Sequence, residues 1–343
     1  MKYFFLIFLF LFCPAAYAKD NCNEALFHFE NCSLSENSSG FFEYETDIIK
    51  SPFLFEELIP SLTANDSSFA FYVRVSSDAK KWSSWFFLGS YGEFGRPYLP
   101  RRTEDNFAKI KIDYLSSKKP LLYFQIKFIS KTSLKIKLLS VALSSEKTDR
   151  NIKLYRKSVF ASSYNNIDLK VPFRSQAWED KSISGDICSP VSIGMVMNFY
   201  GVNAASDKIA KLVYDEKNDM YGIWWRSVFA ASLYGFDGYV RYFRDFDDVG
   251  EYILKGIPVI ACVRFEEDEL SGSAVSMSEG HVVVISGFDS KGNPICRDCA
   301  WKSEKTGIVT YPREEFARAW FERGGGVGYI IKLAESFGQT ETD

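Results

Sequence analysis

The chain lacks a strong excess of charge of either sign. Its 41 lysines and arginines oppose 44 aspartates and glutamates, for a net charge of −3. Proteins that bind nucleic acid through its phosphates carry a basic excess, so nucleic acid is excluded as a partner. Beyond the N-terminus no apolar run approaches the roughly 20 residues that a membrane-spanning helix needs. Histidine is also scarce, with 2 in 343 residues, which leaves few candidates for acid–base chemistry.

The N-terminus has the layout of a secretory signal peptide. A basic residue is followed by an apolar run over 3–13 and by small residues at Ala16 and Ala18. This layout predicts a cleaved signal over 1–18 and a secreted or periplasmic protein. The apolar run is too short to cross a bilayer comfortably, so no membrane contact is expected after cleavage.

The length of 343 residues predicts two domains. In the first half, short apolar segments are separated by turn residues, and two of them alternate between apolar and polar residues. This spacing predicts an antiparallel β-sandwich over 19–150. In an oxidising compartment, Cys22 and Cys32 are expected to form a disulfide. The predicted strands are 68–77, 82–90, 107–115, 121–130 and 134–144.

The second half mixes helices and strands. The polar stretch 144–151 predicts a boundary, with a linker over 151–167 and a second domain over 168–335. Helices precede an antiparallel set of strands, which is an α+β order. Residues 336–343 are expected to be a disordered tail. The predicted helices are 190–200, 207–215, 222–235, 246–256 and 313–323, and the predicted strands are 257–265, 281–288, 293–300, 307–311 and 327–333.

Cys188 stands where a loop of small residues meets an apolar run, in "SGDICSPVSIGMVMNFYG" (184–201). With Ser189 as the N-cap and Pro190 as the first helical residue, the thiol lies at the positive end of a helix, where the dipole favours a thiolate. The run behind it is apolar nearly all round, so the helix is expected to be buried and to hold the sulfur rigidly. This position predicts a nucleophile.

A thiolate nucleophile needs a histidine to protonate the leaving group and donors to stabilise an oxyanion. His28 lies beside the predicted disulfide of the first domain, whereas His281 begins an apolar, central strand, where it is either a catalytic or a core histidine. Gln176 could offer its side-chain amide beside the backbone N–H of Cys188, although a loop glutamine is ordinarily only solvated.

The strand that follows favours the catalytic role of His281. If 289–292 forms the hairpin turn, Phe288 pairs with Asn293. His281 then lies diagonal to Asp298 on the same side of the sheet, and this carboxylate can orient the imidazole. A slip of one residue in the register would separate the two side chains.

Five segments of the second half occur in a characteristic order and spacing. They are "VPFRSQ" (171–176), "CSPVSIGMVMNFYG" (188–201), "GIPVIACV" (256–263), "GHVVVISGFDSKGNPICRD" (280–298) and "FARAWFERGGGVGYII" (316–331). Through them the chain resembles the stand-alone secreted relatives of cysteine peptidase family 39, over roughly residues 168–333. The upstream stretch 73–92 resembles the β-rich domain that precedes this peptidase in such proteins.

The resemblance implies a papain-like peptidase fold and a role for each of four residues. Cys188 is implied as the nucleophile, His281 as base and acid, Asp298 as the orienting residue and Gln176 as the oxyanion donor. The chemistry above proposes the same four. One departure is Cys299, which stands where the family usually has proline after its aspartate.

The other cysteines have alternative interpretations. Cys296 and Cys299 form a C-x-x-C pair in a strand, which favours a structural disulfide or free thiols over a redox pair. A zinc site from Cys262, Cys296, Cys299 and His281 has suitable ligand types, but it would use the only histidine available for catalysis. Cys262 is otherwise expected to be a small buried apolar residue.

Two further features have both a functional and a structural interpretation. The acidic run 265–270 could select basic substrates, although a solvated edge of a flap is the simpler explanation. Trp224 and Trp225 could line a substrate cleft. Adjacent residues on a helix point in different directions, so at least one of the two is expected in the core.

The sequence therefore predicts a secreted α+β papain-like cysteine peptidase, preceded by an antiparallel β-sandwich, that hydrolyses peptide bonds without a cofactor or metal. Its partner is a peptide or protein substrate. A cell-wall amidase or an acyl transferase would use the same residues. A non-catalytic protein is the remaining alternative, with a degenerate peptidase domain and a sandwich that binds a glycan or cell-wall ligand.

Overall fold

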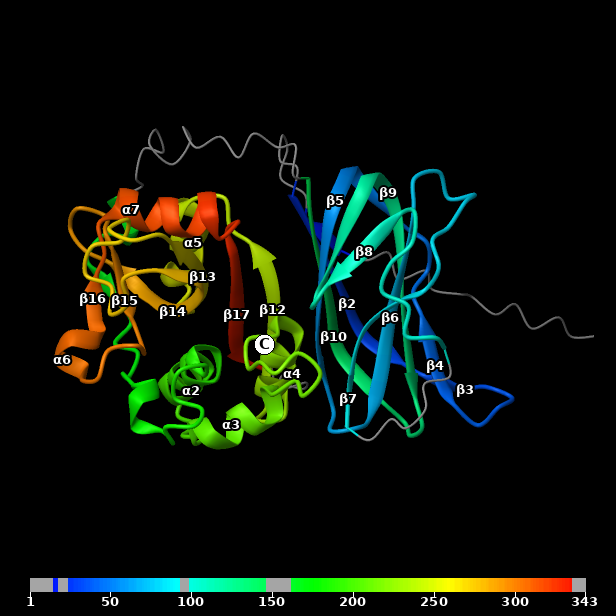
Figure 1. The fold of residues 1–343 in the computed structure, drawn as a ribbon, viewed down its shortest axis with the longest axis horizontal. Helices are drawn as coiled ribbons and strands as arrows, with labels where there is room; N and C mark the ends of the chain where they lie inside the picture. The colour runs from blue at the N-terminus through cyan, green and yellow to red at the C-terminus, as the bar shows by residue number, and fades with distance from the viewer. Residues whose placement is uncertain (1–14, 18–23, 93–98, 146–161, 335–343) are drawn as a thin grey trace, which may run out of the picture.

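The computed structural model describes residues 15–17, 24–92, 99–145 and 162–334, which fold around two antiparallel sheets that lie side by side (Figure 1). The predicted signal peptide lies outside the described residues except for β1 (Ala15–Tyr17), which pairs with β2. The predicted tail also lies outside them. None of the described helices is long and apolar enough to cross a bilayer.

The N-terminal half forms a ten-stranded sheet in the order β1-β2-β10-β5-β9-β4-β3, with β6 and β8 also paired to β9, and β7 paired to β6. Its further strands are β2 (Glu24–Ser33), β3 (Ser35–Glu36), β4 (Phe42–Glu45), β5 (Ile49–Ala64), β6 (Phe69–Ser76), β7 (Phe86–Tyr91), β8 (Ala108–Lys111), β9 (Tyr114–Ser130) and β10 (Lys135–Ser144). The long strands β5 and β9 change partners along their length and so join all strands into one paired sheet. The antiparallel β-rich architecture is confirmed, and the two-layered sandwich stays a prediction.

The predicted strand over 107–115 is wrong at its centre. The chain turns at Ile112 and Asp113, so β8 and β9 pair as a hairpin through Lys111 and Tyr114. Ile112 has a left-handed backbone (φ 59°), which is unusual for a β-branched residue and which the apolar–polar alternation does not signal. The Asp113 Oδ2 atom accepts a hydrogen bond from the backbone N–H of Trp224 at 2.7 Å, so this turn contacts the C-terminal half.

The C-terminal half contains helices and a seven-stranded sheet in the order β12-β17-β13-β14-β15-β16, with β11 added to β14. The helices are η1 (Ser162–Tyr164), η2 (Gln176–Trp178), α2 (Cys188–Phe199), α3 (Ser206–Val213), α4 (Trp224–Ser232), α5 (Phe246–Leu254), α6 (Glu304–Gly307), α7 (Arg313–Ala317) and η3 (Arg318–Arg323). The strands are β11 (Ile167–Asp168), β12 (Phe236–Tyr242), β13 (Val259–Phe265), β14 (Ser278–Phe288), β15 (Pro294–Arg297), β16 (Ile308–Thr310) and β17 (Val327–Leu333). Every helix and strand predicted for this half is present to within a few residues, whereas β12 was missed.

Helix α4 joins the two halves. Trp225 is 1% exposed and packs against Phe69 and Phe71 of the first sheet, with ring centroids 6.1 and 5.0 Å away. A side chain at Gly89 would meet this indole, since an added Cβ would lie 2.5 Å from Trp225 Cζ2. Trp224 is half-exposed and points elsewhere. The expectation that one of the two tryptophans is in the core is therefore confirmed, but the core it enters is that of the N-terminal half.

Candidate active site

Cys188 is the first residue of α2, which begins two positions earlier than the sequence suggests. The N-cap is Ile187 and no side chain caps the helix. The prediction that Ser189 is the N-cap is wrong, because its Oγ atom lies 2.9 Å from Ser227 Oγ on α4, away from the helix N-terminus. The helix behind Cys188 is buried along most of its length, as expected, and Cys188 itself is half-buried.

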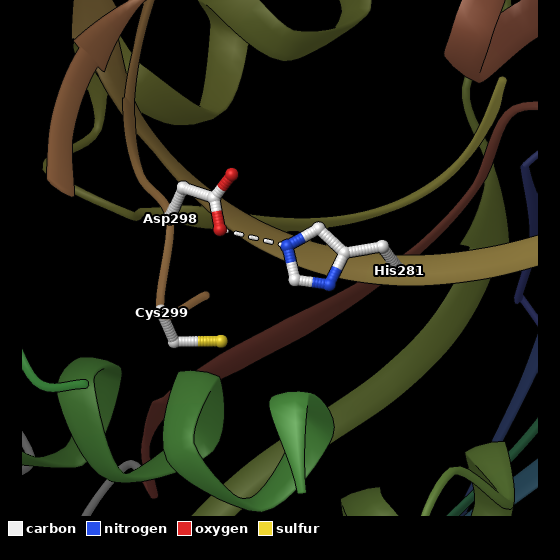
Figure 2. Close-up of side chains that lie close together, drawn as sticks. All are labelled: His281, Asp298 and Cys299. Carbon is white, nitrogen blue, oxygen red and sulfur yellow. Dashed lines mark hydrogen bonds and ion pairs between the residues drawn. The ribbon is translucent and has the colours of Figure 1, made fainter. Parts of the chain in front are cut away.

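His281 and Asp298 are brought together at the edge of α2 (Figure 2). His281 Nε2 lies 2.7 Å from Asp298 Oδ1, and both side chains are buried. Asp298 also accepts hydrogen bonds from the Ala300 N–H at 2.9 Å and from the Tyr311 hydroxyl at 2.6 Å. The carboxylate thus accepts hydrogen bonds from three donors, namely His281, the Ala300 N–H and Tyr311. Because these fix the position of the carboxylate, the carboxylate in turn fixes the orientation of the imidazole.

The hairpin register that places these two residues differs from the prediction near the turn. Phe288 pairs with Pro294 where Asn293 was predicted, because Asp289 accepts hydrogen bonds from the Lys291 and Asn293 N–H groups and makes the turn one residue longer. A bulge between Ile285 and Gly287 then removes the shift. The pairing beyond the bulge is the predicted one, which is why the expected proximity of His281 and Asp298 is present.

The environment favours a charged imidazole. Burial alone would lower the pKa of His281, but the charge and hydrogen bond of Asp298, and then the contact with Cys188, raise that pKa to about 10. Burial likewise opposes ionisation of Asp298, yet His281 and Tyr311 keep the pKa of this carboxyl below its ordinary value. At neutral pH the pair is an imidazolium and a carboxylate, with Cys188 beside the ring.

Gln176 begins η2 and lies next to the same group of residues. Ser175 caps this short helix through a hydrogen bond from the Ala177 N–H, and the Gln176 N–H donates to the Cys299 carbonyl at 2.9 Å. The Cys299 thiol lies 3.6 Å from Gln176 Oε1 and 3.7 Å from the Cys188 carbonyl. Cys299, the departure from the family pattern, therefore fills the space between Gln176 and the start of α2.

The remaining cysteines fit the predictions in part. Cys296 and Cys299 are buried free thiols, which is one of the two expected states. Cys262 is half-buried and lines a cleft, so it is less buried than the small buried apolar residue that was expected. Cys32 is a free buried thiol, and its predicted partner Cys22 lies outside the described residues.

Some of these side chains could also serve as ligands of a metal ion. His281, Asp298 and Cys299 offer ligand atoms that all lie within 4.8 Å of one another. The zinc set considered from the sequence also required Cys262 and Cys296, which are not in this group. A metal bound here would compete with the His281–Asp298 hydrogen bond, so the arrangement fits an ion pair better than a metal centre.

Cys188 and His281 open into a cleft of about 510 Å³. Its walls include Trp224, Tyr242, Val263 and the glycines that follow Arg323. The acidic run lies at its border as a solvated edge, where Glu266 and Glu269 form ion pairs with Arg323. One wall was not predicted: it comes from the N-terminal half, through Glu57, Ile59 and residues 111–114.

The model of the Peptidase_C39 like family matches residues 168–327. The matched residues, which are a little under half of the chain, are similar to the C39-like cysteine peptidases. No curated protein sequence matches the chain.

Three solved structures are similar to part of the chain. A putative C39-like peptidase from Bacillus anthracis is 19% identical, with 49% of this chain and 98% of that chain covered and a TM-score of 0.38. A double glycine motif protease from an AMS/PCAT transporter, in complex with the leader peptide, is 20% identical, with coverages of 50% and 97% and a TM-score of 0.33. The peptidase domain of Streptococcus ComA, a bi-functional ABC transporter, is 17% identical, with coverages of 44% and 93% and a TM-score of 0.33.

Proposed function

We propose that this C39-like protein is a secreted or periplasmic cysteine peptidase with a papain-like domain, and that it hydrolyses peptide bonds. The observation that carries the proposal is the buried His281–Asp298 pair, 2.7 Å apart, beside a half-buried Cys188 at the start of α2. These are the residue types and the contacts that nucleophilic catalysis by a thiolate requires. The N-terminal half is proposed to be a β-sandwich that accompanies the peptidase.

Each group has a defined step. The Cys188 thiolate attacks the carbonyl carbon of the scissile amide, and the carbonyl oxygen becomes an oxyanion. The His281 imidazolium gives its proton to the amine as the carbon–nitrogen bond breaks, which leaves a thioester on Cys188. His281 then removes a proton from water, which attacks the thioester and restores the thiolate. Asp298 keeps the imidazole oriented and stabilises its charged form.

Gln176 is assigned to the oxyanion. Because the Cys299 thiol occupies the carbonyl end of its amide, the Nε2 group is left to donate toward the reacting carbonyl, beside the backbone N–H of Cys188. Cys299 is in this account a positioning residue that holds the amide in one orientation.

Replacement of the Gln176 amide tests this assignment. Gln176→Ala is expected to lower kcat by about 10²-fold with little change in KM, because an oxyanion donor acts in the transition state only. The measurement is cleavage of a proteome-derived peptide mixture, followed by kinetics on a peptide that is cut, with product masses determined. Gln125→Ala, in the first sheet, serves as the control. A wild-type protein that cleaves no peptide, or a Gln176→Ala variant with unchanged kcat, would contradict the proposal.

An acyl transferase or an amidase would use the same thioester. The transferase passes the acyl group to an amine, whereas the amidase, like a peptidase, passes it to water. Product masses in the same assay therefore distinguish transfer from hydrolysis.

A further inference from the structure

The turn between β8 and β9 of the N-terminal half enters the cleft that contains Cys188 and His281. Lys111, Ile112, Asp113 and Tyr114 all line it. The turn is tightly constrained, since Ile112 is held in a left-handed conformation that costs a β-branched residue energy. The N-terminal half is therefore part of the cleft itself.

Asp113 is the buried acid of this wall. It is 6% exposed, and its Oδ2 atom accepts the Trp224 N–H at 2.7 Å. Among the described residues no lysine or arginine forms an ion pair with it. Burial raises the pKa of the carboxyl to about 7, partly offset by hydrogen bonds from backbone N–H groups, and the charge of Asp215 adds to the rise. A buried carboxyl without a cationic partner is energetically costly.

Asp113 and Cys188 line the same cleft, together with Cys262 and Tyr329. Burial raises the pKa of Cys262 to about 12, and the charges of both Cys188 and Asp113 add to this rise. Burial also raises the pKa of Tyr329, on the neighbouring strand β17, and the charges of Cys262 and Asp113 add to this rise.

The walls beside this carboxyl are aromatic. The rings of Tyr114 and Trp224 are stacked, with centroids 5.8 Å apart and planes 27° apart, and both line the cleft. Lys111 Nζ lies 5.7 Å from the centre of the Tyr114 ring, so this ring already accepts a cation on its face. Aromatic walls with a buried carboxylate at the base form a typical environment for a cationic group.

Three other charged side chains that line the cleft are exposed, in contrast to the buried Asp113. Arg264, Glu279 and Arg323 are exposed at the rim, and Arg323 is paired with Glu266 and Glu269. Glu57, on the wall, accepts the Tyr242 hydroxyl at 3.0 Å. The buried carboxyl of Asp113 is thus distinct from the mixed charges of the rim.

We propose that Asp113 is a specificity-determining residue of this peptidase, and that it binds a cationic group, a lysine or arginine side chain or a free amino group, next to the scissile bond. The inference rests on the proposed function, because it assumes a peptide substrate. The preference of Cys188 for cationic over neutral reagents can nevertheless be measured without turnover. The β-rich half then contributes directly to substrate choice.

The test uses two small thiol reagents on the full protein. Aminoethyl methanethiosulfonate is cationic, and methyl methanethiosulfonate is neutral. The rate at which each reagent modifies Cys188 is measured by site-resolved mass spectrometry at pH 8. Each rate is then divided by the rate of the same reagent with a free thiol in solution. In the wild type the cationic reagent is expected to be favoured by about fivefold or more. Asp113→Asn, which keeps an oxygen for the Trp224 N–H, is expected to abolish most of this preference. Glu279→Gln, at the rim, is the matched control and should retain it.

The outcomes separate this inference from the peptidase function. A wild-type protein that shows no cationic preference overturns the role of Asp113 without any variant, as does an Asp113→Asn variant with an undiminished preference. Slow reaction of Cys188 with both reagents argues against the catalytic thiol, whatever their ratio. If Asp113→Asn does not fold, Asp113→Glu replaces it and is expected to keep the preference.

Discussion

Cys188→Ala is expected to abolish turnover, with a loss of about 10⁴-fold or more in kcat, while the fold is preserved. Removal of a nucleophile eliminates the covalent intermediate, and the other catalytic groups cannot replace it. The fold should survive because Cys188 is only half-buried and makes no capping hydrogen bond at the start of α2. The measurement is peptide cleavage, combined with circular dichroism and thermal unfolding of the same samples.

Cys32→Ala is the matched control for this experiment. Cys32 is also a cysteine without a disulfide partner among the described residues, but it lies in β2 of the first sheet and does not line the cleft. Activity should persist in this variant. Retained turnover in Cys188→Ala would contradict the assignment of the nucleophile and would leave the match to the family model as a likeness of sequence alone.

Trp225→Ala is expected to lower the free energy of unfolding by about 3–5 kcal/mol. The indole is 1% exposed and fills the space between Phe69, Phe71 and Gly89, so its removal leaves a cavity between the two halves of the molecule. Gly89→Ala tests the same contact from the other side, because its new methyl group must displace the indole. Denaturant unfolding followed by two optical probes measures the change.

Leu54→Ala is the control for Trp225→Ala. Leu54 is 54% exposed on β5, and its truncation should change stability by less than about 0.5 kcal/mol. If Trp225→Ala were as stable as the wild type, the shared core would not contribute to folding. The β-rich half would then be an independent module, and its role as a wall of the cleft would lose its structural basis.

The fold could be predicted from sequence wherever local patterns decide it. The apolar run after Cys188 predicts α2, and the alternation of 134–144 predicts β10. Strand β12 was missed, although alternate residues from Phe236 to Tyr242 are buried. Its Gly238 weakens the pattern, and the glycine is needed because a Cβ there would lie 2.7 Å from the Ile330 carbonyl oxygen of the neighbouring strand.

The candidate site was predictable in its residue types and only partly in its surroundings. The chemistry and the motifs point to Cys188, His281, Asp298 and Gln176 as candidates, and the structure places the four near one another. Tyr311, the third hydrogen-bond donor to Asp298, follows β16. No local sequence pattern indicates that Tyr311 contacts Asp298.

Asp113 was missed for a related reason. It lies 111 positions from Trp224, and its turn interrupts an alternating segment that predicts a continuous strand. Contacts between distant segments leave no periodicity in either of them. The structure is therefore needed to show that the N-terminal half forms one wall of the cleft.

The central claim is that Cys188 and His281 form a reactive ion pair, and site-resolved alkylation tests it most directly. Iodoacetamide labelling of Cys188 is followed by mass spectrometry between pH 6 and 9, in the wild type and in His281→Gln. Because the pKa of His281 is raised to about 10, its charge persists across this range. Because a charged imidazole beside the sulfur favours the thiolate, labelling of Cys188 should depend less on pH in the wild type than in His281→Gln. Identical pH profiles in the two proteins would contradict the account.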